Sequence, residues 1–285
     1  MRIDLHAHSN ASDGTDSPAD VIASAAHAGL DVVALTDHDT VSGHAAAAAA
    51  LHRLPPGSLT LVPGAELSCR VEGISMHMLA YLFDAEEPEF SRERERIRTD
   101  RFRRGEAVVE RCRALGAPIS WEQVRRIAGD GAVGRPHIAS ALVEAGVVPT
   151  VGDAFTAEWL ANGGRADVRK QELDPAEAVR LVRAAGGVAV FAHPGAVKRG
   201  RTVPDRVIAD LAAVGLAGLE VDHSDHDEHT RARLRGLAAD LGLLTTGSSD
   251  YHGSRKAVRL GDFTTDPAVY EELIARATGA KPITA

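Results

Sequence analysis

The stretch IDLHAHSNASDG, residues 3–14, places two histidines directly after a short apolar segment. Residues 3–5 resemble the start of a buried strand, and His6 and His8 come next, one residue apart. Side chains i and i+2 of an extended segment lie on the same face, so these two imidazoles can bind one ion together. A single His-x-His pair is a weak signal for a metal site, so the interpretation depends on the residues at the ends of the other strands.

Short apolar runs alternate with helical patterns along the rest of the chain, which favours βαβ units and a parallel sheet. Seven strands separated by helices predict an α/β fold, a closed or nearly closed β/α barrel, with its chemistry at the carboxyl ends of the strands. The strands are expected at residues 3–5, 32–36, 59–62, 78–82, 188–192, 218–221 and 243–246.

Several helix ends are marked by capping residues. Ser17-Pro18 and Asp174-Pro175 are typical N-cap and first-turn pairs, and Gly29 and Gly186 are expected to end the two helices that begin there. Two more helices are expected at 204–215 and 227–242.

Residues 91–167 break the alternation, because they are helical in pattern and contain no expected strand. We therefore expect a helical insertion at 91–167 that covers the active site. The barrel itself is expected to comprise residues 1–90 and 168–285.

Composition limits the classes of function. The chain has 285 residues, and its net charge of -8 argues against general nucleic-acid coating, which depends on neutralising phosphates. Two cysteines cannot form a disulfide framework and fit a reducing compartment. No apolar run is long enough for a membrane span, so we expect a cytoplasmic protein.

Histidines and carboxylates recur at the ends of the expected strands. One exception is His77, which begins its apolar run instead of coming after it. Imidazole and carboxylate together form a ligand set that suits Mn²⁺, Fe²⁺ or Zn²⁺. Because the number of these groups exceeds what one ion needs, two or three ions are expected. The candidate ligands are His6, His8, Asp13, His38, Glu66, His77, His193, Asp250 and His252.

The motifs DLHAHSNASDG, TDHDT, PGAELS, FAHPG and SSDYHG, in this order, resemble those of the polymerase and histidinol phosphatase (PHP) superfamily. The resemblance covers the barrel part and implies a distorted (β/α)7 barrel with phosphoesterase chemistry on two or three divalent ions, Mn²⁺ first. It implies one ion on His6, His8, Glu66 and Asp250, a second on Glu66, His77 and His193, and a third on Asp13, His38 and His252.

The motif GRPHIA, residues 134–139, is similar to one in smaller stand-alone members of the superfamily. These act on nucleoside 3′,5′-bisphosphates, or on short 5′-phosphorylated RNA as 5′-to-3′ exonucleases. The resemblance thus implies a small nucleotide or short oligoribonucleotide substrate, without a stable nucleic-acid complex. Alternatives are a phosphatase of histidinol phosphate or another small metabolite, a metal-dependent amidohydrolase, and a non-catalytic metal-binding barrel. The helical insertion departs from the pattern expected of histidinol-phosphate phosphatases.

The expected mechanism is in-line attack on phosphorus by a metal-bridging hydroxide, with no protein nucleophile. A second phosphate of the substrate needs cations, and Arg135 is the first candidate, with His137 beside it in the same motif. A second basic group comprises Lys198, Arg199 and Arg201.

Other basic residues are less informative. His223 comes just after the sixth expected strand and is a further candidate for the site, whereas His226 and His229 are expected to be exposed. The arginines between residues 92 and 104 alternate with glutamates at i,i+3 spacing, which predicts a solvated helix face.

Overall fold

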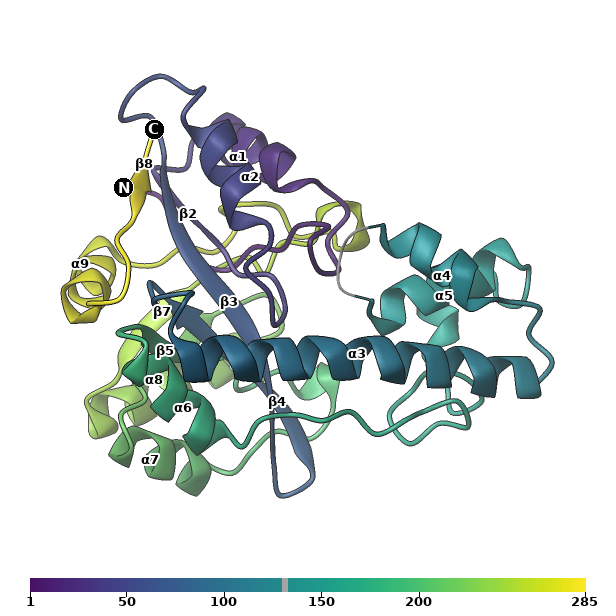
Figure 1. The fold of residues 1–285 in the computed structure, drawn as a ribbon. Coiled ribbons are helices and arrows are strands. Elements are labelled where there is room, and N and C mark those ends of the chain that lie inside the picture. Colours follow the sequence, from purple (N-terminus) through teal and green to yellow (C-terminus); the bar gives the residue numbers. More distant parts are fainter. Residues whose placement is uncertain (130–132) are drawn as a thin grey trace.

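The computed structural model describes residues 1–129 and 133–285 and contains one continuous, nearly closed sheet (Figure 1). Its strands are arranged in chain order from β1 to β7, and β8 pairs with β3 at the side. The bounds are β1 Ile3–Asp4, β2 Val32–Leu35, β3 Thr60–Val71, β4 Ile74–Tyr81, β5 Val188–Ala192, β6 Gly218–Asp222, β7 Leu244–Gly247 and β8 Ile283–Thr284. All seven expected strands are present, and the distorted seven-stranded barrel is confirmed.

The barrel closes through the segments directly after its first and last strands. The His8 backbone N–H donates to the Tyr251 carbonyl at 2.8 Å, and the Tyr251 N–H donates to the His6 carbonyl at 3.3 Å. Because these residues also carry the first and last candidate ligand motifs, closing the barrel brings both motifs together.

The fourth strand reverses direction, which the sequence pattern did not predict. β4 runs antiparallel to both β3 and β5, so the expectation of an all-parallel sheet is wrong for this strand. Glu72 and Gly73, both with positive φ, form a two-residue turn that joins Val71 to Ile74. The reversal places the beginning of β4 at the carboxyl end of its neighbours, with His77 opposite Ala192. This geometry explains why His77 begins its apolar run.

Six helices cover the barrel strands. Their bounds are α1 Pro18–His27, α2 His44–Leu51, α6 Pro175–Ala184, α7 Asp205–Ala213, α8 Glu228–Leu241 and α9 Pro267–Arg276. The predicted caps are confirmed: the Ser17 side chain accepts from the Asp20 N–H, and the Asp174 side chain accepts from the N–H groups of Ala176 and Glu177. Short 3₁₀ turns lie at Gly152–Ala154, Val197–Arg199 and Gly253–Arg255.

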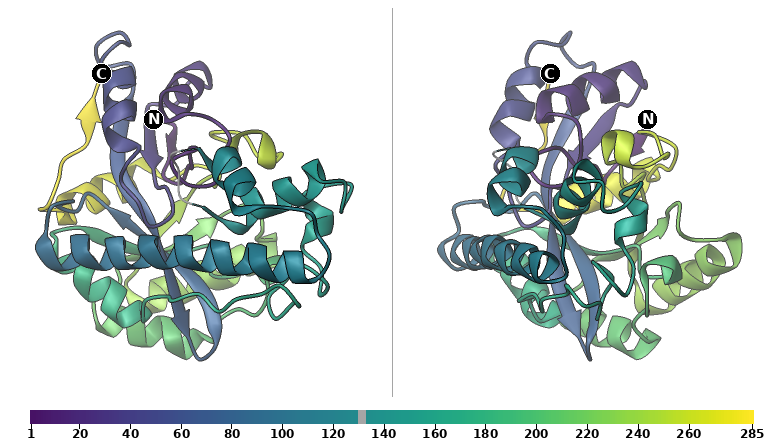
Figure 2. Two further views of the ribbon diagram at one scale, coloured as in Figure 1. Left: turned by 45° about the vertical axis from the view of Figure 1, so that its right-hand side comes forward. Right: turned by 90° about the vertical axis from the view of Figure 1, so that its right-hand side faces the viewer.

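The helical segment projects from the barrel. α3 (Pro88–Ala114) begins on the barrel and runs across the molecule to α4 (Trp121–Ala128) and α5 (Arg135–Glu144), as Figures 1 and 2 show. Its first turns contribute Phe90 and Ile97 to a barrel core, whereas its later turns contribute Val108 and Val109 to a separate core shared with α4 and α5. No strand lies between residues 91 and 167 in the part that the structure describes. In the described ranges, no helix is both long and apolar enough to cross a membrane.

The separate core leads to a stability prediction. Leu142 is fully buried in this core, so Leu142→Ala should lower the free energy of unfolding by about 2–5 kcal/mol through lost burial and the cavity left behind. Chemical denaturation followed by circular dichroism measures the change. Val214→Ala, at a side chain that is 43% exposed, is the control and should change stability by less than about 0.5 kcal/mol. Equal effects of the two substitutions would contradict a packed core in this segment.

Candidate metal centre

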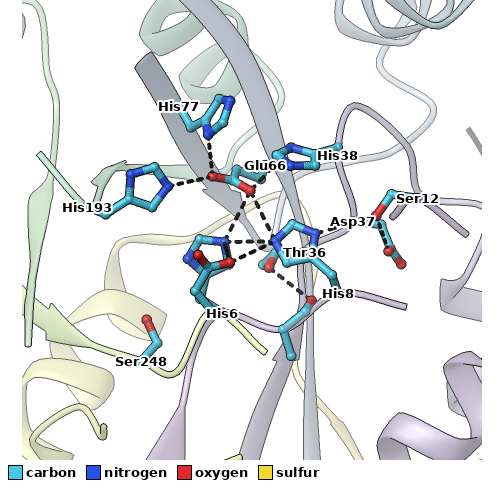
Figure 3. A network of polar contacts seen from close by, with 12 residues as sticks. His6, His8, Ser12, Thr36, Asp37, His38, Glu66, His77, His193 and Ser248 are labelled. Atoms are coloured by element: carbon cyan, nitrogen blue, oxygen red, sulfur yellow. Dashed lines mark hydrogen bonds and ion pairs between the residues drawn. The ribbon is translucent and has the colours of Figure 1, made fainter. Parts of the chain in front are cut away.

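The site is built around one buried carboxylate, Glu66, in the middle of β3 (Figure 3). Imidazole nitrogens approach its two oxygens at 2.9–3.2 Å from several elements of the barrel. These imidazoles belong to His6, His8, His38, His77 and His193. Loops after β1, β2 and β5 therefore converge on one point, as the pattern of strand ends predicted, and the reversed strand β4 joins them.

The candidate ligands form three overlapping groups, in each of which the ligand atoms lie within 4.8 Å of one another. The first is the expected set of His6, His8, Glu66 and Asp250. The second joins His8 to the expected set of Asp13, His38 and His252. The third contains His38, Glu66 and His77. His193 lies beside this third group, 3.1 Å from the Glu66 Oε1 atom that His77 contacts at 2.9 Å.

Three buried atoms of the cluster indicate that these residues fit divalent ions. His38 Nδ1, His77 Nδ1 and Asp250 Oδ1 lie within 3.4 Å of another cluster atom but make no hydrogen bond in the described structure. Such groups are costly unless a ligand satisfies them. Nitrogen and carboxylate donors without thiolates match Mn²⁺, Fe²⁺ and Zn²⁺ chemistry, so the donor set and the unpaired atoms agree.

Two candidate ligands have strained backbones. His193 has a φ of 35° and Asp250 a φ of 53°, in the left-handed region that non-glycine residues avoid. Strain of this kind persists where the surrounding structure enforces it, and it concentrates at functional sites. The strain therefore indicates that contacts with other parts of the protein hold both residues in this conformation.

Polar residues next to the candidate ligands hold the loops that carry them. Asp37 accepts hydrogen bonds from the Ser9 N–H and hydroxyl and from the Ser12 hydroxyl, at 2.6–2.8 Å. These bonds tie the loop after β1 to the loop after β2. They thereby fix Asp13, whose carboxylate lies 3.4 Å from His252 Nε2 and 3.8 Å from His38 Nε2.

The two oxygens of Asp250 face different surroundings. Oδ1 lies 3.4 Å from the Nε2 atoms of both His6 and His8. Oδ2 accepts from Arg199 Nη2 and from Lys256 Nζ, each at 2.6 Å, and lies 3.4 Å from His223 Nε2. The structure thus brings His223 and Arg199 to the site. Lys256, which sequence reasoning missed, lies just beyond the SSDYHG motif and has no spacing signal of its own.

Neighbouring charges and burial shift the imidazole pKa values in opposite directions. Burial lowers the pKa of His8, but hydrogen bonds to Asp250 and Glu66 outweigh it and raise the pKa to about 9. Burial, followed by the Arg199 charge, lowers the pKa of His193 to about 3. His193 is therefore neutral, as a metal-binding imidazole must be, whereas His8 would release a proton on binding an ion.

A cavity of about 670 Å³ opens beside the cluster, with His77 and His193 in its wall. Its lining contains seven cationic side chains and one carboxylate, Asp167, although the whole chain is acidic. The cations are Arg70, Arg104, Arg135, Arg169, Lys170, Arg199 and Arg201. Such a lining favours an anionic ligand with more than one charge.

Other predicted residues lie elsewhere. Lys198 is exposed and outside the cavity lining. His137 is buried, outside that lining, and accepts a hydrogen bond from the Gly134 N–H at 3.0 Å, so it caps α5. His226 is also buried, contrary to expectation, because it bonds the Val221 carbonyl and the Gly195 N–H.

The predicted solvated face of α3 is only partly correct. Arg96 and Arg98 pair with Glu93 and Glu95 at the surface, as expected. By contrast, Arg101 donates to the buried carboxylate of Asp39, next to His38, at 2.8 Å. Arg104 also turns inward and lines the cavity. The i,i+3 spacing cannot distinguish the exposed face of α3 from the face that turns inward, because arginines occupy both faces.

Metal binding should stabilise the protein. Chelator-treated protein should gain about 2.7 kcal/mol of unfolding free energy when Mn²⁺ is added at 100 times its dissociation constant, since the ion binds only the folded site. Glu66→Gln should lose this gain, whereas Glu72→Gln, at the exposed tip of the same hairpin, should keep it. Thermal unfolding with and without Mn²⁺, together with metal analysis, measures the effect. An unchanged gain in Glu66→Gln would contradict the assignment.

Comparison with known proteins agrees with this geometry. The PHP domain model matches residues 4–99. The 3′,5′-nucleoside bisphosphate phosphatase of Chromobacterium violaceum is 35% identical over 294 residues, covering 96% of this chain and 97% of its own length. The 5′-3′ exoribonuclease of Haemophilus influenzae is 31% identical over 260 residues, covering 91% and 93%. A crystal structure of a protein assigned to the metal-dependent phosphoesterases, from Bifidobacterium adolescentis, superposes with a TM-score of 0.91 at 36% identity, covering 97% and 96%. The chain therefore belongs to the PHP family of metal-dependent phosphoesterases.

Proposed function

We propose that this enzyme hydrolyses phosphate esters of nucleotides, with a nucleoside 3′,5′-bisphosphate as the preferred substrate. The observation that carries the proposal is the cationic cavity that adjoins the histidine cluster. A bisphosphate can place one phosphate at the cluster and the other against the cations of the cavity wall. The similarity to a bisphosphate phosphatase along nearly the whole chain supports this choice.

Short 5′-phosphorylated RNA is the second candidate. The similarity to an exoribonuclease favours it, and the cavity wall extends to cations on the β3–β4 hairpin and the loop after β5, such as Arg70 and Arg201. A mononucleotide would leave these outer cations unused, whereas an oligonucleotide backbone could contact them.

The predicted phosphate-binding residue Arg135 is held in place at the cavity. Its Nη1 donates to the Leu160 carbonyl at 3.0 Å and to Asn162 Oδ1 at 2.8 Å. Its other N–H groups make no hydrogen bond within residues 1–129 and 133–285. We infer that these groups bind a phosphate, for which guanidinium geometry is well suited. Arg104 and Lys170 line the same cavity and would share its charge.

The proposed metal ligands are the nine residues predicted from sequence: His6, His8, Asp13, His38, Glu66, His77, His193, Asp250 and His252. When bound there, two or three divalent ions, with Mn²⁺ as the proposed species, supply a hydroxide nucleophile and neutralise the charge of the reacting phosphate.

A protein nucleophile is not required. The two cysteines are both buried and unpaired, and burial raises the pKa of Cys69 well above its usual range and that of Cys112 to about 11, so neither offers a thiolate. Two reduced thiols also support the proposal of a cytoplasmic location.

Arg199 and His223 would orient the substrate and supply a proton to it. Arg199 lies 3.2 Å from His193 Nε2 and can bind a phosphate oxygen at the edge of the cluster. His223 Nδ1 accepts from the Asp225 N–H at 2.9 Å, so neutral His223 carries its proton on Nε2. That proton faces Asp250 Oδ2, 3.4 Å away, where it can be donated to a phosphate or leaving-group oxygen.

A substrate panel tests the proposal. Protein purified with Mn²⁺ is assayed on adenosine 3′,5′-bisphosphate, 5′-phosphorylated short RNA, histidinol phosphate and a dipeptide. We expect the highest kcat/KM with the bisphosphate, because it can place one phosphate at the cluster and the other at the cavity wall with no further nucleotides to accommodate. A preference of more than about tenfold for histidinol phosphate, or about 1.4 kcal/mol in transition-state binding, would overturn the assignment. Cleavage of the dipeptide alone would indicate an amidohydrolase.

Arg135→Ala should raise KM for the bisphosphate by roughly 10- to 100-fold, because charged hydrogen bonds contribute about 1.5–3 kcal/mol. KM for a simple aryl phosphate should change little, since that substrate has no second phosphate. The control is Arg113→Ala, at an exposed arginine of α3 that pairs with Glu110. Steady-state kinetics on both substrates measure the difference, and equal changes in KM would remove Arg135 from the second phosphate site.

A further inference from the structure

Another buried carboxylate, Glu220 on β6, contacts two of the candidate metal ligands. Its Oε1 accepts hydrogen bonds from His6 Nδ1, at 2.9 Å, and from the Ser248 hydroxyl. Its Oε2 accepts from the His193 backbone N–H at 2.7 Å. The sequence pattern does not single it out, because Glu220 lies within an apolar strand and not at its end.

All three contacts require Glu220 to act only as an acceptor. A backbone N–H and a hydroxyl that points at a carboxylate are both donors, which leaves His6 to donate from Nδ1. With its two oxygens occupied by three donors, Glu220 needs no proton of its own in this arrangement.

The contact with His6 decides which ring nitrogen is free. With the proton held on Nδ1, the lone pair of Nε2 points at the cluster. That atom lies 3.2 Å from Glu66 Oε2 and 3.4 Å from Asp250 Oδ1. A carboxylate in this position also makes the imidazole a stronger electron donor.

The contact with His193 stabilises a strained backbone. His193 has a φ of 35°, and the bond from its N–H to Glu220 Oε2 compensates part of the cost of that conformation. The same carboxylate thus holds two candidate ligands that contact different oxygens of Glu66.

We propose that Glu220 is a positioning residue of the metal centre, which keeps His6 in the Nδ1–H tautomer and fixes the backbone of His193. The inference rests on the proposed metal ligands. It extends the site to a residue that touches neither substrate nor ion.

Glu220→Gln tests the proposal with little change of shape. The amide has one acceptor and one donor end, so either His6 must move its proton to Nε2 or the amide NH₂ must face the His193 N–H. Mn²⁺ affinity, followed by electron paramagnetic resonance of free Mn²⁺, should fall about 10- to 100-fold. The matched control is Asp222→Asn on the same strand, whose carboxylate pairs with Arg235 outside the site and whose loss should leave Mn²⁺ affinity unchanged. A folded Glu220→Gln protein with wild-type affinity would overturn the proposal.

A measurement on the wild-type chain covers the case in which Glu220→Gln does not fold. Long-range ¹H–¹⁵N spectra of the metal-free protein report histidine tautomers, and His6→Gln identifies the His6 signals. We expect His6 Nδ1 to carry a proton before any ion binds, whether the ring is neutral or doubly protonated. An Nε2–H tautomer would overturn the proposal.

These outcomes separate the two inferences. If wild-type protein binds no Mn²⁺, the proposed metal centre fails, whatever the tautomer of His6. If wild type binds Mn²⁺ and Glu220→Gln binds it equally well, the metal centre stands and only the role of Glu220 fails.

Discussion

A carboxylate buried in a barrel and surrounded by imidazoles is the constraint on which this structure depends. Burying the charge of Glu66 is costly unless positive or coordinating partners surround it. The protein meets this requirement with five histidines from four segments of the chain, each within 3.2 Å. Those histidines can approach one point only if the strands that precede them converge, so the barrel and the site require each other.

The reversed strand β4 is the clearest example of this dependence. An all-parallel barrel would place the start of this strand at the opposite end from the site. Because Glu72 and Gly73 turn the chain tightly, β4 returns antiparallel and brings His77 to within 2.9 Å of Glu66. A local feature of two residues thus decides whether one candidate ligand reaches the cluster.

The helical segment adds cations to the wall of the cavity beside the cluster. It contributes Arg104 and Arg135 to the cavity wall, and Lys170 comes directly after it. Arg101 also ties α3 to Asp39, the residue next to His38. We therefore infer that the helical segment and the barrel share the binding of anions, since Arg70, Arg199 and Arg201 of the same wall belong to the barrel.

Much of this architecture is determined by short-range patterns in the sequence. Apolar runs located the barrel strands, caps such as Ser17 and Asp174 located helix ends, and the period of two residues put His6 and His8 on one face, because all three depend on local backbone geometry. The direction of β4 depends on which strand it pairs with, and the sequence pattern did not reveal it. The inward turn of Arg101 and the places of Lys256 and Glu220 also come from the tertiary structure alone. Their functions arise from contacts with residues far away in the chain, and no local period records such contacts.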